Sequence, residues 1–217
     1  MKATYVKLAY NQPPIYSTRL TISFNYTYVV STCRMNTIDT SQYPDQLNSK
    51  TEQIKQTFAE FTVPELEVFA SKPSHYRLRA EFRIWHTDDR CHYAMTEKGN
   101  KKNIYEVTDF PIASELINRL MPELLHELNN IPLLKRRLFQ AEFLTTLSGD
   151  ALITLIYHRQ LDDEWKELAL ALQTKLGVSI IGRARKQKVV LDRDFVIEEL
   201  TVDNKNYKYK QIEGGFT

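Results

Sequence analysis

The sequence predicts an α+β fold, built mainly from antiparallel sheets with helices packed against them. Residues 71–86 alternate apolar and polar side chains, which is typical of a strand with one buried face. Residues 112–128 and 165–176 carry apolar side chains at helical spacing. Strands and helices follow one another in mixed runs, without the regular alternation that predicts a doubly wound sheet.

The N-terminal part of the chain differs in composition from the rest. Residues 1–34 are rich in Tyr and Thr, and only a weak alternation over residues 20–30 indicates a strand. After this stretch, Pro44 opens a run of apolar residues at helical spacing. It predicts a helix over residues 44–61 that ends before Pro64.

The strand predicted over residues 71–86 has two chemically different faces. The alternate residues on the first face are apolar: Tyr76, Leu78, Ala80, Phe82 and Ile84. Those on the second face are mostly charged: Arg77, Arg79, Glu81, Arg83 and Trp85. An arginine-bearing face suits an anionic partner. Rows of charged residues also occur on exposed sheet faces that bind nothing, where they only maintain solubility. The alternation does not distinguish a binding face from a solvated one.

Two further strands, 91–96 and 103–108, are joined by a turn at 97–100 and complete a three-stranded antiparallel meander. Asp109 and Pro111 predict the start of a helix that runs to residues 129–130. Pro122 is expected to kink or restart this helix, because proline cannot donate the helical hydrogen bond. Residues 131–137 predict a short basic helical turn.

The C-terminal third predicts two hairpins and a helix. Strands 138–147 and 151–158 are joined at 148–150, and the second is apolar on both parities, so it is expected at the centre of the sheet. A helix then runs from 162 to Gly177, and strands 178–181 and 188–191 pair around a basic corner. Two short strands, from Phe195 and from Tyr207, complete the chain.

Composition excludes several classes of protein. The chain has 217 residues and a formal net charge of +2, so any nucleic-acid binding must come from local clustering of charge. Its two cysteines, Cys33 and Cys91, lie too far apart for a zinc site, an iron–sulfur cluster or a disulfide framework. No apolar run is long enough to span a bilayer. We therefore expect a cytoplasmic protein with no metal or iron–sulfur cluster.

Motifs of known enzymes are missing from the sequence. No phosphate-binding loop, zinc-protease helix, nucleophile elbow or Gly-rich dinucleotide turn is found, and the chain has only six glycines. The residues by themselves predict no catalytic centre.

Six segments together carry a resemblance to a known family. They are SHYRLRAEFRIWH (74–86), DFPIASELINRLM (109–121), LFQAEFLTTLS (138–148), YHRQLDDEW (157–165), IGRARKQKVVLDRDFV (181–196) and YKQIEGGFT (209–217). In this order and spacing they resemble the N-terminal half of bacterial tRNA (uracil-5-)-methyltransferases. The resemblance runs from about Met35 to Thr217. It implies that residues 1–34 are an unmatched extension, that Met35 is the translation start, and that 35–217 form one α+β RNA-binding domain.

The resemblance also implies a function. Members of this family methylate C5 of the T-loop uridine of tRNA with S-adenosylmethionine. Their C-terminal Rossmann-like domain binds the cofactor and supplies a cysteine nucleophile and a glutamate base. The chain ends at Thr217, where the family continues into that domain, so we expect the Rossmann-like domain to be absent and this RNA-binding half to be inactive alone.

Site residues follow from the same resemblance. It places RNA contacts on Arg83, Phe139 and His158, although spacing alone would put Phe139 in the core. Weaker candidates for phosphate contact are Arg77, Arg79, Arg183, Arg185 and Lys186. The expected partner is the tRNA T-arm, with transfer-messenger RNA open as a second substrate. Two alternatives remain: a stand-alone RNA-binding or tRNA-folding module, and a protein-interaction domain whose arginines are only solvated.

Overall fold

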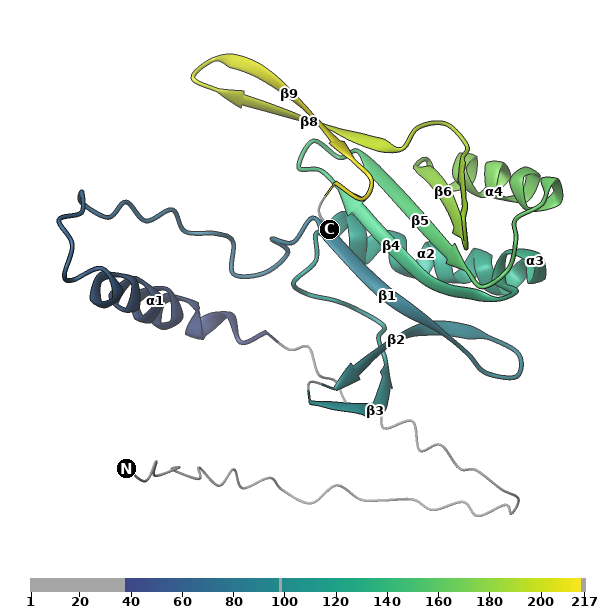
Figure 1. Cartoon of the computed structure of the whole chain (residues 1–217), viewed down its shortest axis with the longest axis horizontal. Helices are drawn as coiled ribbons and strands as arrows, with labels where there is room; N and C mark the ends of the chain where they lie inside the picture. Colours follow the sequence, from purple (N-terminus) through teal and green to yellow (C-terminus); the bar gives the residue numbers. More distant parts are fainter. Residues whose placement is uncertain (1–37, 98, 216–217) are drawn as a thin grey trace.

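The computed structural model describes residues 38–97 and 99–215 and contains two sheets. The strands are β1 (Arg79–His86), β2 (Cys91–Glu97), β3 (Asn100–Glu106), β4 (Leu138–Thr145), β5 (Ala151–Tyr157), β6 (Ser179–Ala184), β7 (Gln187–Val190), β8 (Phe195–Val202) and β9 (Lys205–Ile212). The main sheet has the order β3-β2-β1-β4-β5-β6-β7, and β8 and β9 form a separate hairpin (Figure 1). Only β5 and β6 pair in parallel. The predicted α+β class with mainly antiparallel pairing is confirmed.

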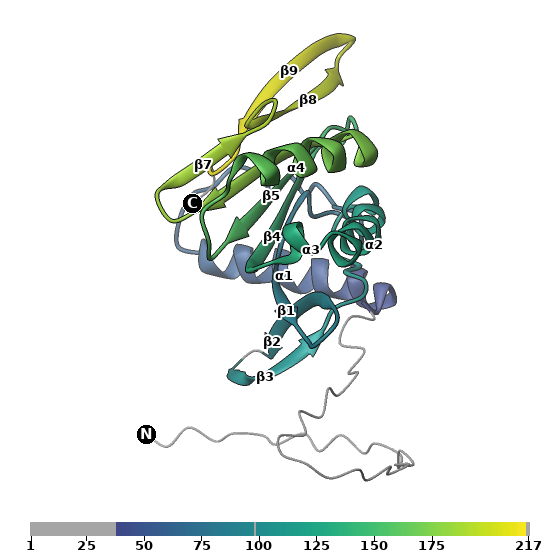
Figure 2. The ribbon, with the colours of Figure 1, turned by 90° about the vertical axis from the view of Figure 1, so that its right-hand side faces the viewer.

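Two helices, α2 (Glu115–Asn130) and α4 (Asp163–Leu176), cover one face of the main sheet, with the single turn α3 (Pro132–Lys135) beside them (Figure 2). Buried tyrosines tie the sheet to this layer: the Tyr93 hydroxyl donates to the Met121 carbonyl at 2.9 Å and the Tyr157 hydroxyl to the Leu134 carbonyl at 2.8 Å. β5 is buried almost throughout, as its apolar sequence predicts. None of the described helices covers the opposite face of the sheet (Figures 1 and 2).

Helix α2 begins later than predicted. Its N-cap is Ser114, whose Oγ accepts from the Ile117 amide at 3.2 Å, so Asp109 and Pro111 belong to the preceding loop. The Asn118 side chain holds this loop by accepting from the Phe110 amide at 2.8 Å. The helix also continues through Pro122, so the predicted restart is wrong. Pro122 is exposed, and its ring therefore displaces no core side chain.

Strand β1 is shorter than the alternation indicated. Before Arg79 the chain leaves the regular ladder: the Leu78 carbonyl still accepts from the Thr145 amide at 2.8 Å, and Arg77 forms an isolated bridge with Ala113. His75 has a positive φ of 55° and donates its amide to the Pro111 carbonyl at 2.8 Å. Tyr76, expected on the core face, is consequently exposed. From Arg79 to Ile84 the alternation holds, with every second residue buried.

Residues 38–72 form an arm that extends away from the sheet (Figure 1). The arm contains helix α1 (Tyr43–Thr57), preceded by one 3-10 turn, and an extended strap over residues 58–72. The helix begins with Pro44 in its first turn, as predicted, and ends four residues earlier than expected. None of its residues is buried. The predicted extension 1–34 and its weak strand lie outside the described residues.

The β8–β9 hairpin packs across one end of the helix-free face. Val196 forms a small buried cluster with Leu152 and Ile181. Glu198 accepts from the Leu147 and Ser148 amides at 2.7 and 2.9 Å, which fixes the hairpin to the β4–β5 turn. The hairpin therefore covers the end of this face near the β4–β5 turn, away from Phe139 at the other end of β4. None of the described helices is long and apolar enough to cross a membrane.

Candidate nucleic-acid interface

A row of paired residues crosses the helix-free face of the main sheet. Strand register places Arg83 opposite Gln140, Gln140 opposite Ile156, Ile156 opposite Arg183, and Arg183 opposite Lys188. Directly paired residues point to the same side of a sheet, so this row brings three cations onto one surface. Arg83, Arg183 and Lys188 are all exposed.

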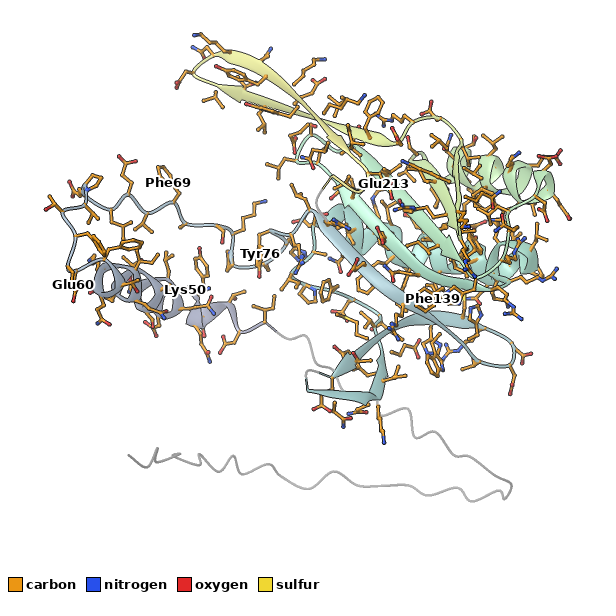
Figure 3. The ribbon with its side chains drawn as sticks, in the orientation of Figure 1. Lys50, Glu60, Phe69, Tyr76, Phe139 and Glu213 are labelled. Atoms are coloured by element: carbon orange, nitrogen blue, oxygen red, sulfur yellow. The ribbon has the colours of Figure 1, made fainter. Side chains whose placement is uncertain are left out.

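Phe139 and His158 lie beside Arg83 at the end of this row. The two rings stack with their centroids 4.3 Å apart and an interplanar angle of 21°. Cζ of Arg83 lies 5.5 Å from the centroid of the Phe139 ring, within the range of a cation–π contact. The three residues that the family resemblance selected are therefore brought together, from β1, β4 and the end of β5. Figure 3 shows Phe139 at one end of this face and Glu213 toward the other.

A bulge in β4 explains why Phe139 is not in the core. Leu138 pairs with Tyr157 and Gln140 with Ile156, so β4 has one extra residue at this point. Leu138 and Ala141 are buried, whereas Phe139 and Gln140 between them are only partly buried. A bulge breaks the two-residue period and re-aims side chains. The core position that spacing gave for Phe139 is therefore wrong.

A basic groove of about 690 Å³ adjoins the stack at the carboxyl ends of the parallel strands β5 and β6. Its charged and polar walls come from His158, Arg159, Gln160, Arg183 and Arg185. His158 belongs to both the stack and the groove. The two features therefore form one continuous surface.

The cations of this groove differ in how firmly they are held. Arg159 is structural, because its guanidinium donates to the Leu133 carbonyl at 3.0 Å and to the Arg136 carbonyl at 3.2 Å. Arg183 forms an ion pair with Glu213 at 2.9 Å. Arg185 is exposed and has no ion-pair partner among residues 38–97 and 99–215. Arg83 and Arg185 are thus the groups most available to an anionic ligand.

Arg77 and Arg79 lie away from the stack. Arg79 is four residues from Arg83 along β1, roughly 13 Å at the rise of a strand. It pairs with Glu142 at 3.7 Å, and Arg77 donates its Nε to the Arg79 carbonyl at 3.1 Å. Burial raises the pKa of Glu142, and the charge of Arg79 opposes this rise. These two arginines border the surface and are not part of the cluster.

Cys91, the cysteine within the described residues, is not a candidate nucleophile. Cys91 is 1% exposed, and burial raises the pKa of its thiol to about 11. The reactive form of cysteine is the thiolate, so this thiol is inert at neutral pH. Within the same residues, no three His, Cys, Asp or Glu side chains gather in a way that could hold a metal ion.

Comparison of the chain with known proteins identifies one family. The profile of the family described as tRNA (Uracil-5-)-methyltransferase matches residues 42–217. A tRNA/tmRNA (uracil-C(5))-methyltransferase of Acinetobacter baylyi is 54% identical over 178 residues, covering 81% of this chain and 49% of the relative. The protein of the same name from Chromohalobacter salexigens is 54% identical over 184 residues, covering 83% and 49%. The chain thus spans about half the length of the curated relatives it matches.

Among solved structures, the chain is similar to the crystal structure of the tRNA (uracil-54, C5)-methyltransferase of Pyrococcus abyssi in complex with S-adenosyl-L-homocysteine. The TM-score is 0.48 at 16% sequence identity. The match covers 80% of this chain and 43% of the other.

Proposed function

Because the chain belongs to the tRNA (uracil-5-)-methyltransferase family, we propose that residues 38–215 are the part of an S-adenosylmethionine-dependent tRNA uracil-C5 methyltransferase that holds the RNA. The observation that carries this proposal is the cluster of Arg83, Phe139 and His158 on an open sheet face. The expected substrate is the T-loop uridine of tRNA, and transfer-messenger RNA is a second candidate.

The cluster suits an RNA loop for chemical reasons. A base in a folded loop must be unstacked before an enzyme reaches its ring atoms. Proteins hold such splayed bases on aromatic rings and bind the neighbouring phosphates with arginine. We assign base stacking to Phe139 and His158, and contact with a phosphate or base edge to Arg83. Arg183 and Arg185 then follow the RNA backbone along the groove, with Arg77 and Arg79 as an extension of this surface.

We infer that residues 38–215 do not bind the methyl donor. A Rossmann-type site uses a Gly-rich turn from a strand into a helix. Here Gly99 and Gly149 lie in hairpin turns, Gly177 ends a helix, Gly182 lies within β6, and Gly214 and Gly215 follow β9. We therefore place S-adenosylmethionine binding and the catalytic groups in the half of the family proteins that this chain does not match, and propose that residues 38–215 alone transfer no methyl group.

Binding of a T-arm stem-loop RNA by the whole chain tests the proposal. Phe139→Ala and His158→Ala should each weaken binding about fivefold or more, since stacking contributes about 1–3 kcal/mol per base. Phe69→Ala is the matched control, because Phe69 is an exposed aromatic on the arm, far from the cluster (Figure 3). Its affinity should equal that of the unchanged chain.

Two results would contradict the proposal. If the unchanged chain bound no RNA even at low salt, the alternative of a protein-interaction domain would hold. If the chain methylated tRNA when given S-adenosylmethionine, the assignment of catalysis to the unmatched half would be wrong. Equal losses in the Phe69 control and in the cluster variants would show that the cluster has no special role.

A further inference from the structure

The arm, residues 38–72, presents an unusual amount of apolar surface to solvent. Phe69 is 85% exposed and Phe61 is 66% exposed. Five more apolar side chains of the arm are also exposed: Ile54, Phe58, Val63, Leu66 and Val68. Contiguous apolar surface on a folded protein marks an interaction site more often than chance.

The arm has little within itself to hold its conformation. Helix α1 buries no residue, and the strap belongs to no sheet. Beyond the turn that follows the helix, where the Phe58 and Ala59 amides donate to the Ile54 and Gln56 carbonyls, the two parts are joined by a hydrogen bond between the Tyr43 hydroxyl and Ser71 Oγ at 3.2 Å. An isolated helix of this length is marginal in water. A binding partner that covers the apolar side chains is therefore the physical reason for such a conformation.

The charge of the strap argues against RNA as that partner. Between Phe58 and Phe69 the charged residues are Glu60, Glu65 and Glu67, and the first basic residue of the strap is Lys72. Lysine and arginine supply the electrostatic attraction to phosphate, so an apolar and acidic strap disfavours a nucleic acid. Apolar side chains with an acidic rim fit a protein surface instead.

We propose that the arm docks on the half of the family proteins that this chain does not match. The family match begins at residue 42, so the arm is a feature that the relatives share and its partner is expected among them. The relatives are about twice as long as the matched region, and each thus carries a second polypeptide part of similar size. A pocket of about 500 Å³ lies where the arm meets the body, lined by Lys50, Phe69 and Tyr76 among others (Figure 3).

Proteolysis with the Glu-specific protease Glu-C tests this docking, because Glu60, Glu65 and Glu67 lie between the apolar side chains concerned. The substrates are this chain alone and a fusion of this chain to the unmatched half of the Acinetobacter baylyi relative. Cleavage within the strap should be fast in the chain alone and at least about tenfold slower in the fusion. In the fusion, the double change Phe61→Asp and Phe69→Asp should restore fast cleavage, whereas Thr62→Asp, a matched control, should not.

Three outcomes would overturn the proposal. One is a folded fusion whose strap is cut as fast as that of the free chain. Another is a free chain that is already protected and elutes as a dimer, which would make a second copy the partner. If the fusion did not fold, amide hydrogen exchange of the free chain would decide, since slow exchange in the arm of a monomer would show that no partner is needed. The T-arm RNA titration is independent of these outcomes, because the arm variants should bind RNA as the unchanged chain does.

Discussion

Phe82 and Arg83 are neighbours in β1 that point to opposite faces of the sheet. Phe82 is 1% exposed and lies 5.3 Å from the rings of both Tyr93 and Phe110. Arg83 is exposed on the face that carries the Phe139–His158 stack. A single step along the chain thus separates a residue that stabilises the fold from one that we assign to RNA.

We predict opposite effects for the two substitutions. Phe82→Ala should lower the free energy of unfolding by about 3–5 kcal/mol, because it leaves a cavity in the core. Arg83→Ala should change it by less than about 0.5 kcal/mol and weaken RNA binding. Urea denaturation and RNA titration of both variants measure this. If both changes unfolded the protein equally, the assignment of two faces to β1 would be wrong.

Glu142 gives a prediction about pH. Burial raises the pKa of this carboxyl in the folded state, so its contribution to stability is present at low pH and is lost as pH rises through the folded pKa. Glu142→Gln removes that titration. From about pH 4 to about pH 7, the variant should gain stability relative to the unchanged protein, measured by urea denaturation at both values. A difference that stays constant between the two pH values would refute this cause.

At the scale of elements, α4 packs closely on β6 because residue 182 is a glycine and has no side chain. Gly182 lies in β6 directly under the Trp165 ring, and a Cβ placed there would come within 2.5 Å of Leu161 Cδ1 and still closer to Trp165 Cη2. Trp165 is fully buried. The close packing of this helix on the sheet therefore requires glycine at this position.

Gly182→Ala should destabilise the protein by about 1–3 kcal/mol, as overpacking of a core does. Thermal unfolding measures the loss, and Gly149→Ala is an informative comparison. Gly149 has a φ of +95° with open space around its Cβ position, so its cost comes from the backbone alone. In a Trp165→Leu background, Gly182→Ala should cost less stability than in the unchanged protein, a partial rescue that Gly149→Ala should not show. Failure of that rescue would show that the ring is not the obstacle.

At the scale of the whole molecule, function depends on where charge is placed. The net charge is only +2, yet the open end of the sheet gathers Arg83, Arg183, Arg185 and Lys188. Glu213 neutralises part of this charge by pairing with Arg183 and Lys188, whereas the strap of the arm carries three glutamates and no basic residue before Lys72. The helix-free face of the sheet is therefore suited to phosphate, and the strap of the arm to a protein surface.

This distribution predicts the salt dependence of RNA binding. If Arg83, Arg183 and Arg185 each meet one phosphate, the slope of log K against log salt should be about −2 to −3. Arg185→Ala should make that slope less steep by about 0.7–0.9. RNA titrations at several salt concentrations measure both values. A slope near zero would mean that these arginines make no phosphate contact.

The sequence by itself determined the class of the fold and most of its elements. The residues of a segment were sufficient to predict its structure where no unusual pairing intervenes. Examples are the strand β5, which is apolar throughout, and the helix that begins after Asp162 and ends at Gly177. The segments that resemble the family also selected Arg83, Phe139 and His158, because recognition of a family does not depend on knowing where each side chain points.

Only the tertiary structure decided which way those side chains face. The bulge at Phe139 is a shift in the register between β4 and β5. The alternation within one strand does not show how that strand pairs with its neighbour. Likewise, the alternation of residues 71–78 continues past the point where the chain leaves the sheet for the loop at Pro111. The spacing that predicted helix α1 could not show that none of its residues is buried. A local pattern specifies the conformation of a segment, whereas burial depends on what packs against it.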